Sequence, residues 1–241
     1  MRLPATGVLL MALCAPAAAA ERYPDIPHVE GLVVEGINAF RREQGLGTLR
    51  VNRDLEATAR DFAAFMARSG KFDHDADGST PADRVRRHGY DYCIVAENIA
   101  REYSSRGFAT AQLARELVEG WKNSPGHRKN ILEAEALDTG VAIAHRTFKG
   151  NEDYYAVQVF GRPRSESVEF QVRNASRVSV RYRIGERSFT VAPRQLRRHT
   201  ECAPRALDFE GTHPAHVAAA KGDKFVVVHR GGALAIERDP L

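Results

Sequence analysis

The period of the hydrophobic pattern changes near residue 165, and this change limits the possible folds more than any other feature of the chain. Between Val29 and Phe40, and in later segments up to Trp121, apolar residues recur at helical spacing. Beyond residue 165, short segments alternate apolar and polar residues, which is typical of half-buried strands. The sequence therefore predicts an α+β domain over residues 21–164 and a small β-rich domain over residues 165–241.

Within the first domain, caps and glycines mark the ends of the expected helices, and β-branched runs mark the strands. The expected helices begin near residues 29, 52, 80, 108 and 124, and the expected strands lie at residues 90–100, 140–144 and 154–160. In the second domain we expect about five strands, at residues 168–172, 178–184, 188–191, 224–229 and 233–237.

Residues 1–20 have the three regions of a signal peptide. Arg2 supplies a short positive region, residues 8–13 an apolar region, and Ala18-Ala19-Ala20 a cleavage site. This apolar run is too short to span a bilayer, and no later stretch is long and apolar enough to do so. A lipoprotein signal at Cys14 is the alternative, although Leu13 stands where a small residue is usual. We expect cleavage and export to the periplasm or out of the cell.

Two cysteines, Cys93 and Cys202, remain once residues 1–20 are removed. An oxidising compartment permits a disulfide between them. Two buried free thiols are the alternative, because residues far apart in the sequence need not meet in space. The sequence leaves both open.

Positive charge is concentrated in the C-terminal part of the chain. Residues 165–241 contain 13 Lys and Arg against 9 Asp and Glu, whereas residues 21–164 contain 21 against 22. The densest run is formed by Arg194, Arg197, Arg198 and His199. Such a run can attract a polyanion such as an envelope polymer, and it is also typical of a solvated face. We do not expect nucleic acid as a partner, because the protein is expected to be exported and shows no stacking platform.

Two histidines and a glutamate are the candidates for a functional site. His74 lies in a polar loop, Glu97 in an extended segment, and His127 in the first turn of the helix that Ser124-Pro125 begins. Two neutral imidazoles are good ligands for zinc or copper, and a carboxylate can accept a proton from water or fix a histidine tautomer. Structural roles are the alternative: a hydrogen-bonded loop histidine and a carboxylate that caps backbone amides. No compact metal motif is present.

Several short motifs occur in a specific order and spacing. They are Asn38-Ala39-Phe40-Arg41, Phe72-Asp73-His74, Pro81-Ala82-Asp83-Arg84, Ala96-Glu97-Asn98-Ile99-Ala100, Trp121 followed by Ser124-Pro125-Gly126-His127-Arg128, and Val157-Gln158-Val159-Phe160-Gly161. Together they resemble the CAP superfamily, the cysteine-rich secretory, antigen 5 and pathogenesis-related (SCP-like) domain, in its short bacterial form.

The resemblance implies an α-β-α sandwich with a cleft lined by two histidines and two acidic residues, in which the histidines can bind a divalent metal such as zinc. His74, Glu97 and His127 match three of those four positions. Longer members carry a glutamate three residues after the tryptophan, where this chain has Ser124. Asp77 and Asp83 are the nearby acidic residues that could replace it.

Three functions compete. The first is a non-catalytic binding module for a lipid, sterol or envelope glycan, with a metal-capable cleft. The second is a hydrolase that uses zinc on His74 and His127, with Glu97 as the base. The third is docking to an envelope polymer through the basic C-terminal domain. We expect the first, because the set of cleft residues is incomplete and no G-x-S-x-G motif is present. The sequence leaves the oligomeric state open.

Overall fold

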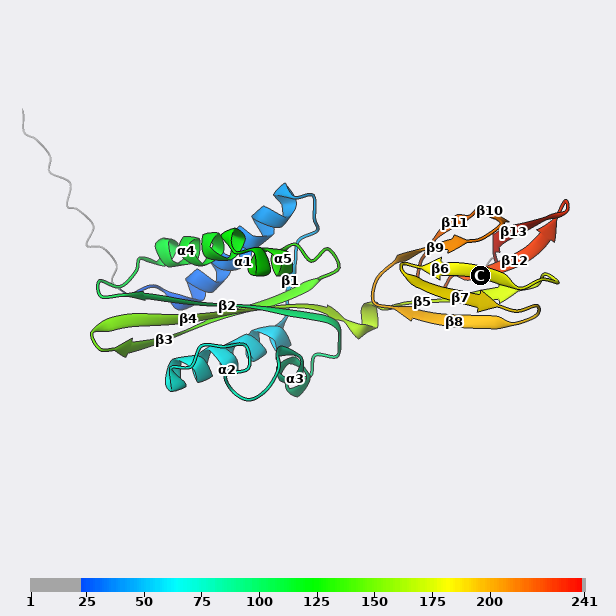
Figure 1. Cartoon of the computed structure of the whole chain (residues 1–241). Helices are drawn as coiled ribbons and strands as arrows, with labels where there is room; N and C mark the ends of the chain where they lie inside the picture. Colours follow the sequence, from blue (N-terminus) through cyan, green and yellow to red (C-terminus); the bar gives the residue numbers. More distant parts are fainter. Residues whose placement is uncertain (1–22, 240–241) are drawn as a thin grey trace, which may run out of the picture.

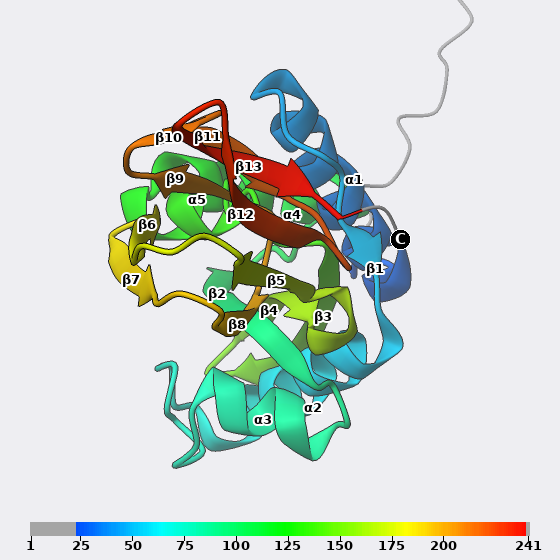
Figure 2. The same ribbon diagram turned by 90° about the vertical axis from the view of Figure 1, so that its right-hand side faces the viewer.

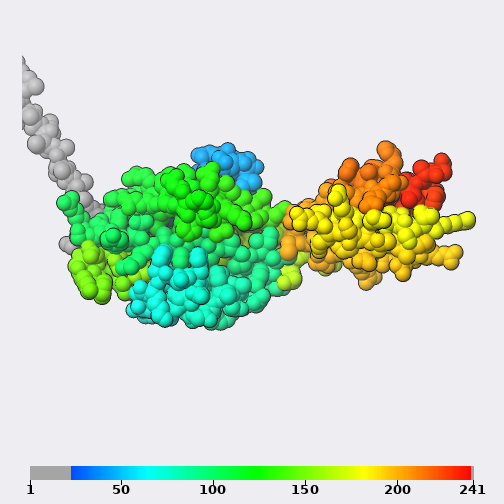
Figure 3. All heavy atoms as spheres, in the orientation of Figure 1, coloured from blue at the N-terminus to red at the C-terminus, as the bar shows by residue number. Residues whose placement is uncertain are grey.

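The computed structural model describes residues 23–239 as two lobes placed end to end (Figure 1 and Figure 3). The expected signal peptide, residues 1–20, lies outside the described residues. From residue 23 to residue 239, no helix combines the length and the apolar character needed to cross a membrane.

The first lobe is a three-layer α-β-α sandwich, as predicted. Its helices are α1 (Ile26–Glu43), α2 (Arg53–Ser69), α3 (Pro81–Arg87), α4 (Thr110–Asn123) and α5 (Pro125–Ile131). Its strands are β1 (Arg50–Val51), β2 (Tyr92–Ser104), β3 (Asp138–Phe148) and β4 (Asn151–Pro163). The strand order is β1-β3-β4-β2, with β1 parallel to β3 and the other pairs antiparallel, so β2 forms an edge of the sheet.

Helices cover both faces of this sheet. Helices α1, α4 and α5 lie on one face, and α2 and α3 on the other (Figure 1). The first face buries a cluster that includes Ile37, Leu117 and Trp121, and the second a cluster that includes Phe62 and Tyr155. The sheet therefore separates two hydrophobic cores. Successive residues of β2 point alternately to one core and to the other.

Local sequence explains where the helices of the second face begin and end. The side chain of Asn52 accepts hydrogen bonds from the first backbone amides of α2, and Gly70 ends this helix in the left-handed conformation, with φ of 72°. The start of α2 agrees with the helix predicted to begin near residue 52. Helix α2 also lies unusually close to β3. A Cβ at Gly140 would lie 2.2 Å from the backbone nitrogen of Glu56, so the close approach requires glycine at this position.

The second lobe is a two-sheet β-sandwich, which Figure 2 views from its outer end. Its strands are β5 (Val168–Asn174), β6 (Val180–Ile184), β7 (Arg187–Val191), β8 (Leu196–Glu201), β9 (Arg205–Phe209), β10 (Thr212–His213), β11 (His216–Ala219), β12 (Lys224–Arg230) and β13 (Ala233–Arg238). One sheet has the order β10-β13-β12-β5-β8 and the other β11-β9-β6-β7. Inward side chains of both sheets form one core, around Phe170, Tyr182 and Phe225.

This lobe has more strands than expected. The five predicted segments correspond to β5, β6, β7, β12 and β13, whereas β8 to β11 were not predicted. Strand β8 contains Arg197, Arg198 and His199 of the basic run, and it exposes Leu196, Arg197 and Arg198 in succession because it is an edge strand. Its sequence therefore lacks the regular alternation by which the other strands were found.

Besides the chain itself, a disulfide and polar contacts join the lobes. The chain passes from β4 to β5 through a single 3-10 turn, η1 (Arg164–Glu166). A disulfide links Cys93, in β2, to Cys202, directly after β8. Beside it, Arg205 of the second lobe lies 3.4 Å from the carboxylate of Glu135.

Candidate functional site

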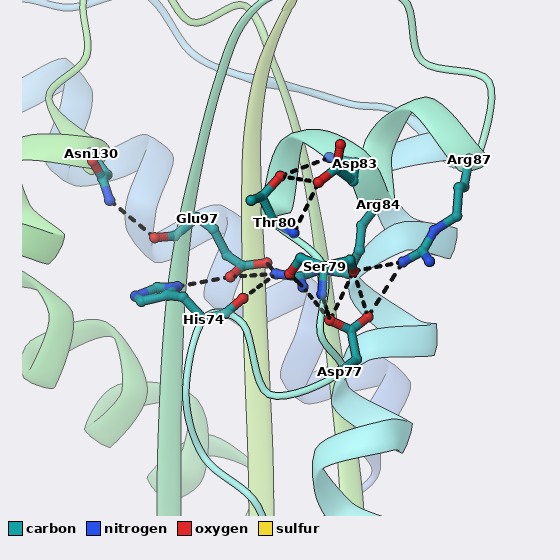
Figure 4. Close-up of polar contacts among 9 residues, drawn as sticks. All are labelled: His74, Asp77, Ser79, Thr80, Asp83, Arg84, Arg87, Glu97 and Asn130. Atoms are coloured by element: carbon teal, nitrogen blue, oxygen red, sulfur yellow. Dashed lines mark hydrogen bonds and ion pairs between the residues drawn. The ribbon is translucent and has the colours of Figure 1, made fainter.

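The candidate site lies across the edge strand β2 of the first lobe (Figure 4). Glu97 belongs to β2 itself, His74 to the loop between α2 and α3, and His127 to α5 on the opposite face of the sheet. The site is therefore built from both helical layers and the strand between them.

A buried arginine holds the carboxylate of Glu97. Nη2 of Arg84 donates to both Glu97 oxygens, at 3.0 and 2.9 Å, and to the carbonyl of His74 at 2.8 Å. The two charged side chains are almost completely buried, with exposed fractions of 4% and 1%. The guanidinium also stacks on the ring of Phe62, 3.5 Å from its centroid. Glu97 thus receives a charge-assisted pair of contacts from a side chain that is itself fixed by packing.

Glu97 in turn orients His74. Nδ1 of His74 lies 2.8 Å from Oε1 of Glu97, and the imidazole side chain is half-exposed. An ionised carboxylate can only accept a hydrogen bond, so the contact assigns the proton of neutral His74 to Nδ1. This leaves Nε2 of His74 as an acceptor or ligand, the arrangement in which an outer carboxylate orients a metal-binding histidine.

Asp77 and Asp83, the two candidates for the missing acidic residue, stabilise the loop and the start of helix α3. Asp77 accepts hydrogen bonds from Ser79 and from Nη1 of Arg84, at 2.9 Å for the latter. Burial alone would raise the pKa of Asp77, but the hydrogen bonds of Ser79 and the charge of Arg84 lower it. Asp83 forms a capping box with Thr80 at the start of α3. Among residues 23–239, neither carboxylate is hydrogen-bonded to His74 or His127.

Amide side chains connect the histidine of α5 to β2. Nδ2 of Asn98 donates to the carbonyl of His127 at 3.2 Å. Nδ2 of Asn130 donates to the carbonyl of Glu97 at 3.0 Å and to Oδ1 of Asn98 at 2.9 Å. These bonds fix the first turns of α5 against the strand, so that His127 has a defined position.

Arg84, Asn98 and Asn130 were not predicted to take part in the site, although two of them lie in motifs that carry the family resemblance. The sequence holds no signal that singles out Arg84, because Arg86 and Arg87 follow it in the same short helix and are exposed.

The two imidazoles differ in their affinity for protons. The hydrogen bond to Glu97 raises the pKa of His74. Burial, and then the charge of His74, lower the pKa of His127. Near neutral pH, His127 is therefore held in its neutral, ligating form.

We expect His74 to titrate at higher pH than His127, measured by NMR of the imidazole protons. Glu97→Gln should lower the pKa of His74 because it removes the accepting carboxylate, whereas Asp75→Asn, on the same loop, should leave the pKa nearly unchanged. Stability follows with opposite signs. His74 stabilises the fold at low pH, and this contribution is lost as pH rises through its raised pKa; the contribution of His127 is present at higher pH and is lost as pH falls through its lowered pKa. Coincident titration of both rings in the unmodified protein would contradict the assignment.

The donors present fit only an open metal site. Structural zinc takes four protein ligands and catalytic zinc takes three. Among the described residues, no three His, Cys, Asp or Glu side chains are placed to hold an ion together. Both oxygens of Glu97 are occupied by Arg84 and His74. A divalent ion would therefore have His74 and His127 as its protein ligands, with water at the other positions.

A protein-family comparison matches the first lobe. Residues 34–160, more than half of the chain, match the model of the CAP family, described as the cysteine-rich secretory protein family. The second lobe lies outside the matched range.

Curated relatives are bacterial. The uncharacterized protein YkwD of Bacillus subtilis is 37% identical over 113 residues, which make up 46% of this chain and 41% of that protein. An uncharacterized protein of Borreliella burgdorferi is 28% identical over 104 residues, 43% of this chain and 61% of its own length. The chain thus spans less than two thirds of the length of these relatives.

Two solved structures are similar to a little more than half of this chain. An outer surface protein from Borrelia burgdorferi is 20% identical, with a TM-score of 0.47, over 56% of this chain and 92% of its own. An extracellular protein containing a SCP domain from Bacillus anthracis is 23% identical, with a TM-score of 0.47, over 57% of this chain and 41% of its own.

Proposed function

Since the chain belongs to the CAP family of cysteine-rich secretory proteins, we propose that it is an exported binding module that holds its ligand at His74 and His127 and catalyses no reaction. The secretory character of the family and the signal-peptide pattern of residues 1–20 both support export to the cell envelope or the extracellular space.

One observation carries the non-catalytic part of this proposal. A general base must reach the proton that it removes, directly or through one water. The carboxylate of Glu97 is 1% exposed, and each of its oxygens already accepts hydrogen bonds from Arg84 or His74. Glu97 is thus suited to position His74 and poorly suited to act on a substrate.

The hydrolase hypothesis needs more than these residues offer. It requires Glu97 to be free as a base and an ion held firmly enough to polarise a carbonyl or water. Two histidines with water at the remaining positions supply a weak site. When bound, the ion would supply a positive charge for an oxygen of the ligand, and the protein would supply a fixed pair of imidazoles.

The exposed imidazole of His74 indicates the class of ligand. Without a metal, Nε2 of His74 and a neutral His127 can accept hydrogen bonds from hydroxyl groups. An envelope glycan presents many such groups, whereas a lipid or a sterol is recognised mainly by an apolar cavity. We therefore favour the glycan among the three expected ligands.

Zinc titration by calorimetry tests the site. We expect saturable binding, weaker than in a site with three ligands, that is lost in His74→Ala and in His127→Ala. His229→Ala, which removes an exposed histidine of the second lobe, should bind as the unmodified protein does. Zinc binding that survives both cleft substitutions would refute the paired-imidazole site.

A second arm separates binding from catalysis. Ester, amide and glycoside substrates are incubated with the zinc-loaded protein and with its Glu97→Gln variant. We expect no turnover by either. Zinc-dependent turnover that disappears in Glu97→Gln would replace the binding module by the hydrolase.

A further inference from the structure

The outer face of the five-stranded sheet gathers cations from three strands. Arg198 of β8 is paired with Gln171 of β5, which is paired with Lys224 of β12. Paired residues share a face, so these three side chains form one row, in which the cations stand two strands, or about 10 Å, apart. Arg173 lies on the same face of β5, two residues from Gln171. We call Gln171, Arg173, Arg198 and Lys224 the cationic face.

The three cations of this face differ from most others in the lobe. Among residues 23–239, Arg173, Arg198 and Lys224 are exposed and have no acidic partner within ion-pair distance. Five other arginines of this lobe are paired with carboxylates of the same lobe. The pairs are Arg181 with Glu210, Arg183 with Asp208, Arg187 with Glu201, Arg230 with Glu237 and Arg238 with Asp223. Arg177, Arg194 and Arg197 also lack an acidic partner among the described residues, but Arg177 and Arg194 lie between strands and Arg197 lies on the other face of β8. The cationic face is therefore the sheet face on which three unpaired cations lie together.

A hollow lies in the cationic face. It has a volume of about 370 Å³, and its lining includes Gln171, Thr200, the cations Arg198 and Lys224, and the carboxylates Glu169 and Asp223. Asp223 is already paired with Arg238, at 3.3 Å. The hollow therefore combines two cations with side chains that donate and accept hydrogen bonds.

The basic run Arg194, Arg197, Arg198 and His199 does not form one surface. Strand alternation exposes Arg198 on the outer face but buries His199, whose Nε2 lies 2.6 Å from the hydroxyl of Tyr182. The guanidinium of Arg197 lies over the ring of Phe189, 5.5 Å from its centroid. Of this run, only Arg198 belongs to the cationic face. The other two cations of that face, Arg173 and Lys224, come from β5 and β12.

From this geometry we propose that the cationic face is a binding site for a linear anionic glycan. The cations would contact its negative groups, while Gln171, Thr200 and Glu169 would bind its hydroxyls. The site is in the second lobe, so it is separate from the paired imidazoles of the first and does not depend on their ligand.

The same residues argue against other polyanions. An anionic membrane surface is continuously negative and would bring like charge against Glu169, which has no cation within ion-pair distance among the described residues. Single-stranded nucleic acid requires exposed aromatic side chains for stacking. Phe170, on the same strand, is 2% exposed and points into the core. A glycan with spaced charges suits both the carboxylate and the cations.

Calorimetry with oligogalacturonate, a linear glycan with one carboxylate per sugar, tests the proposal. Arg198→Ala combined with Lys224→Ala should weaken binding about thirtyfold at physiological salt. The matched control is Arg181→Ala with Arg183→Ala, which removes the same charge from the opposite sheet and should retain nearly full affinity. Variants at His74 and His127 should also bind the glycan normally, which separates this test from that of the imidazole site.

Four results would overturn the proposal. They are absence of glycan binding by the unmodified protein, equal loss in both double variants, equal binding of an uncharged maltooligosaccharide of the same length, and binding of phosphatidylglycerol vesicles in place of the glycan. Circular dichroism establishes that both double variants are folded before they are compared.

Discussion

Replacement of Arg84 by methionine is expected to destabilise the first lobe by about 3–5 kcal/mol, the cost of leaving one partner of a buried ion pair uncompensated. Arg84 is the partner of Glu97, and it also donates to Asp77 and to two loop carbonyls. Methionine keeps an apolar stem of similar length, but it loses all these donors and the guanidinium that stacks on Phe62. The loop that carries His74 should lose its order together with the ion pair.

Urea denaturation followed by circular dichroism measures this effect. Arg86→Met is the control, because Arg86 lies on the same short helix but is 61% exposed, and its ion pair with Asp83 is exposed too. It should cost at most about 1 kcal/mol. Adding Glu97→Met to Arg84→Met should recover part of the loss, since the unpaired buried charge is then removed. If Arg84→Met were no worse than Arg86→Met, the ion pair would not be the element that supports the site.

Trp121→Ala is expected to destabilise the same lobe by about 3–5 kcal/mol. Trp121 is the only tryptophan of the chain, is 1% exposed and lies in the core between α1, α4 and the sheet. Its indole N–H also donates to the carbonyl of Ile99 in β2, at 3.1 Å. The substitution therefore removes a large part of the core and one hydrogen bond to the edge strand.

Trp121→Phe separates these two contributions. Phenylalanine retains an aromatic ring but no donor, so the buried carbonyl of Ile99 loses its partner, at a cost of about 1–3 kcal/mol. Urea denaturation followed by far-ultraviolet circular dichroism measures both variants, because neither retains the fluorescence of tryptophan. Equal losses in the two variants would show that the hydrogen bond, and not the volume of the ring, dominates.

Arg84 and Trp121 both bind residues of β2, which is an edge strand of the sheet. An edge strand presents unpaired backbone groups that must be covered or left to solvent. Here the carbonyls of Glu97 and Ile99 accept hydrogen bonds from the side chains of Asn130 and Trp121. The side chains that cover the edge thus also fix the strand position that carries Glu97.

The fold of the first lobe could be predicted because each of its signals is local or ordered along the chain. The caps at Asn52 and Thr80 and the apolar stripes of the helices are read from neighbouring residues. The second lobe was predicted less well. Strand β8 is recognisable only once β5 lies beside it, because exposure at the edge of a sheet removes the alternation.

The candidate site shows the same division. His74, Glu97 and His127 could be named from their motifs, but their roles depend on contacts between distant parts of the chain. Arg84 reaches Glu97 across 13 residues and Asn130 reaches it across 33. No spacing rule reveals that the carboxylate is fully occupied, and this occupancy distinguishes a positioning residue from a base.

Because of the disulfide, the covalent link between the lobes depends on the compartment in which the chain folds. Cys93 and Cys202 belong to different lobes and are 109 residues apart, so the bond can close only after the chain has been synthesised as far as Cys202. In a reducing compartment the lobes would be held by the η1 connection and a few polar contacts such as Arg205 with Glu135. The covalent link between the lobes therefore depends on an oxidising environment, and thiol labelling distinguishes oxidised molecules from reduced ones.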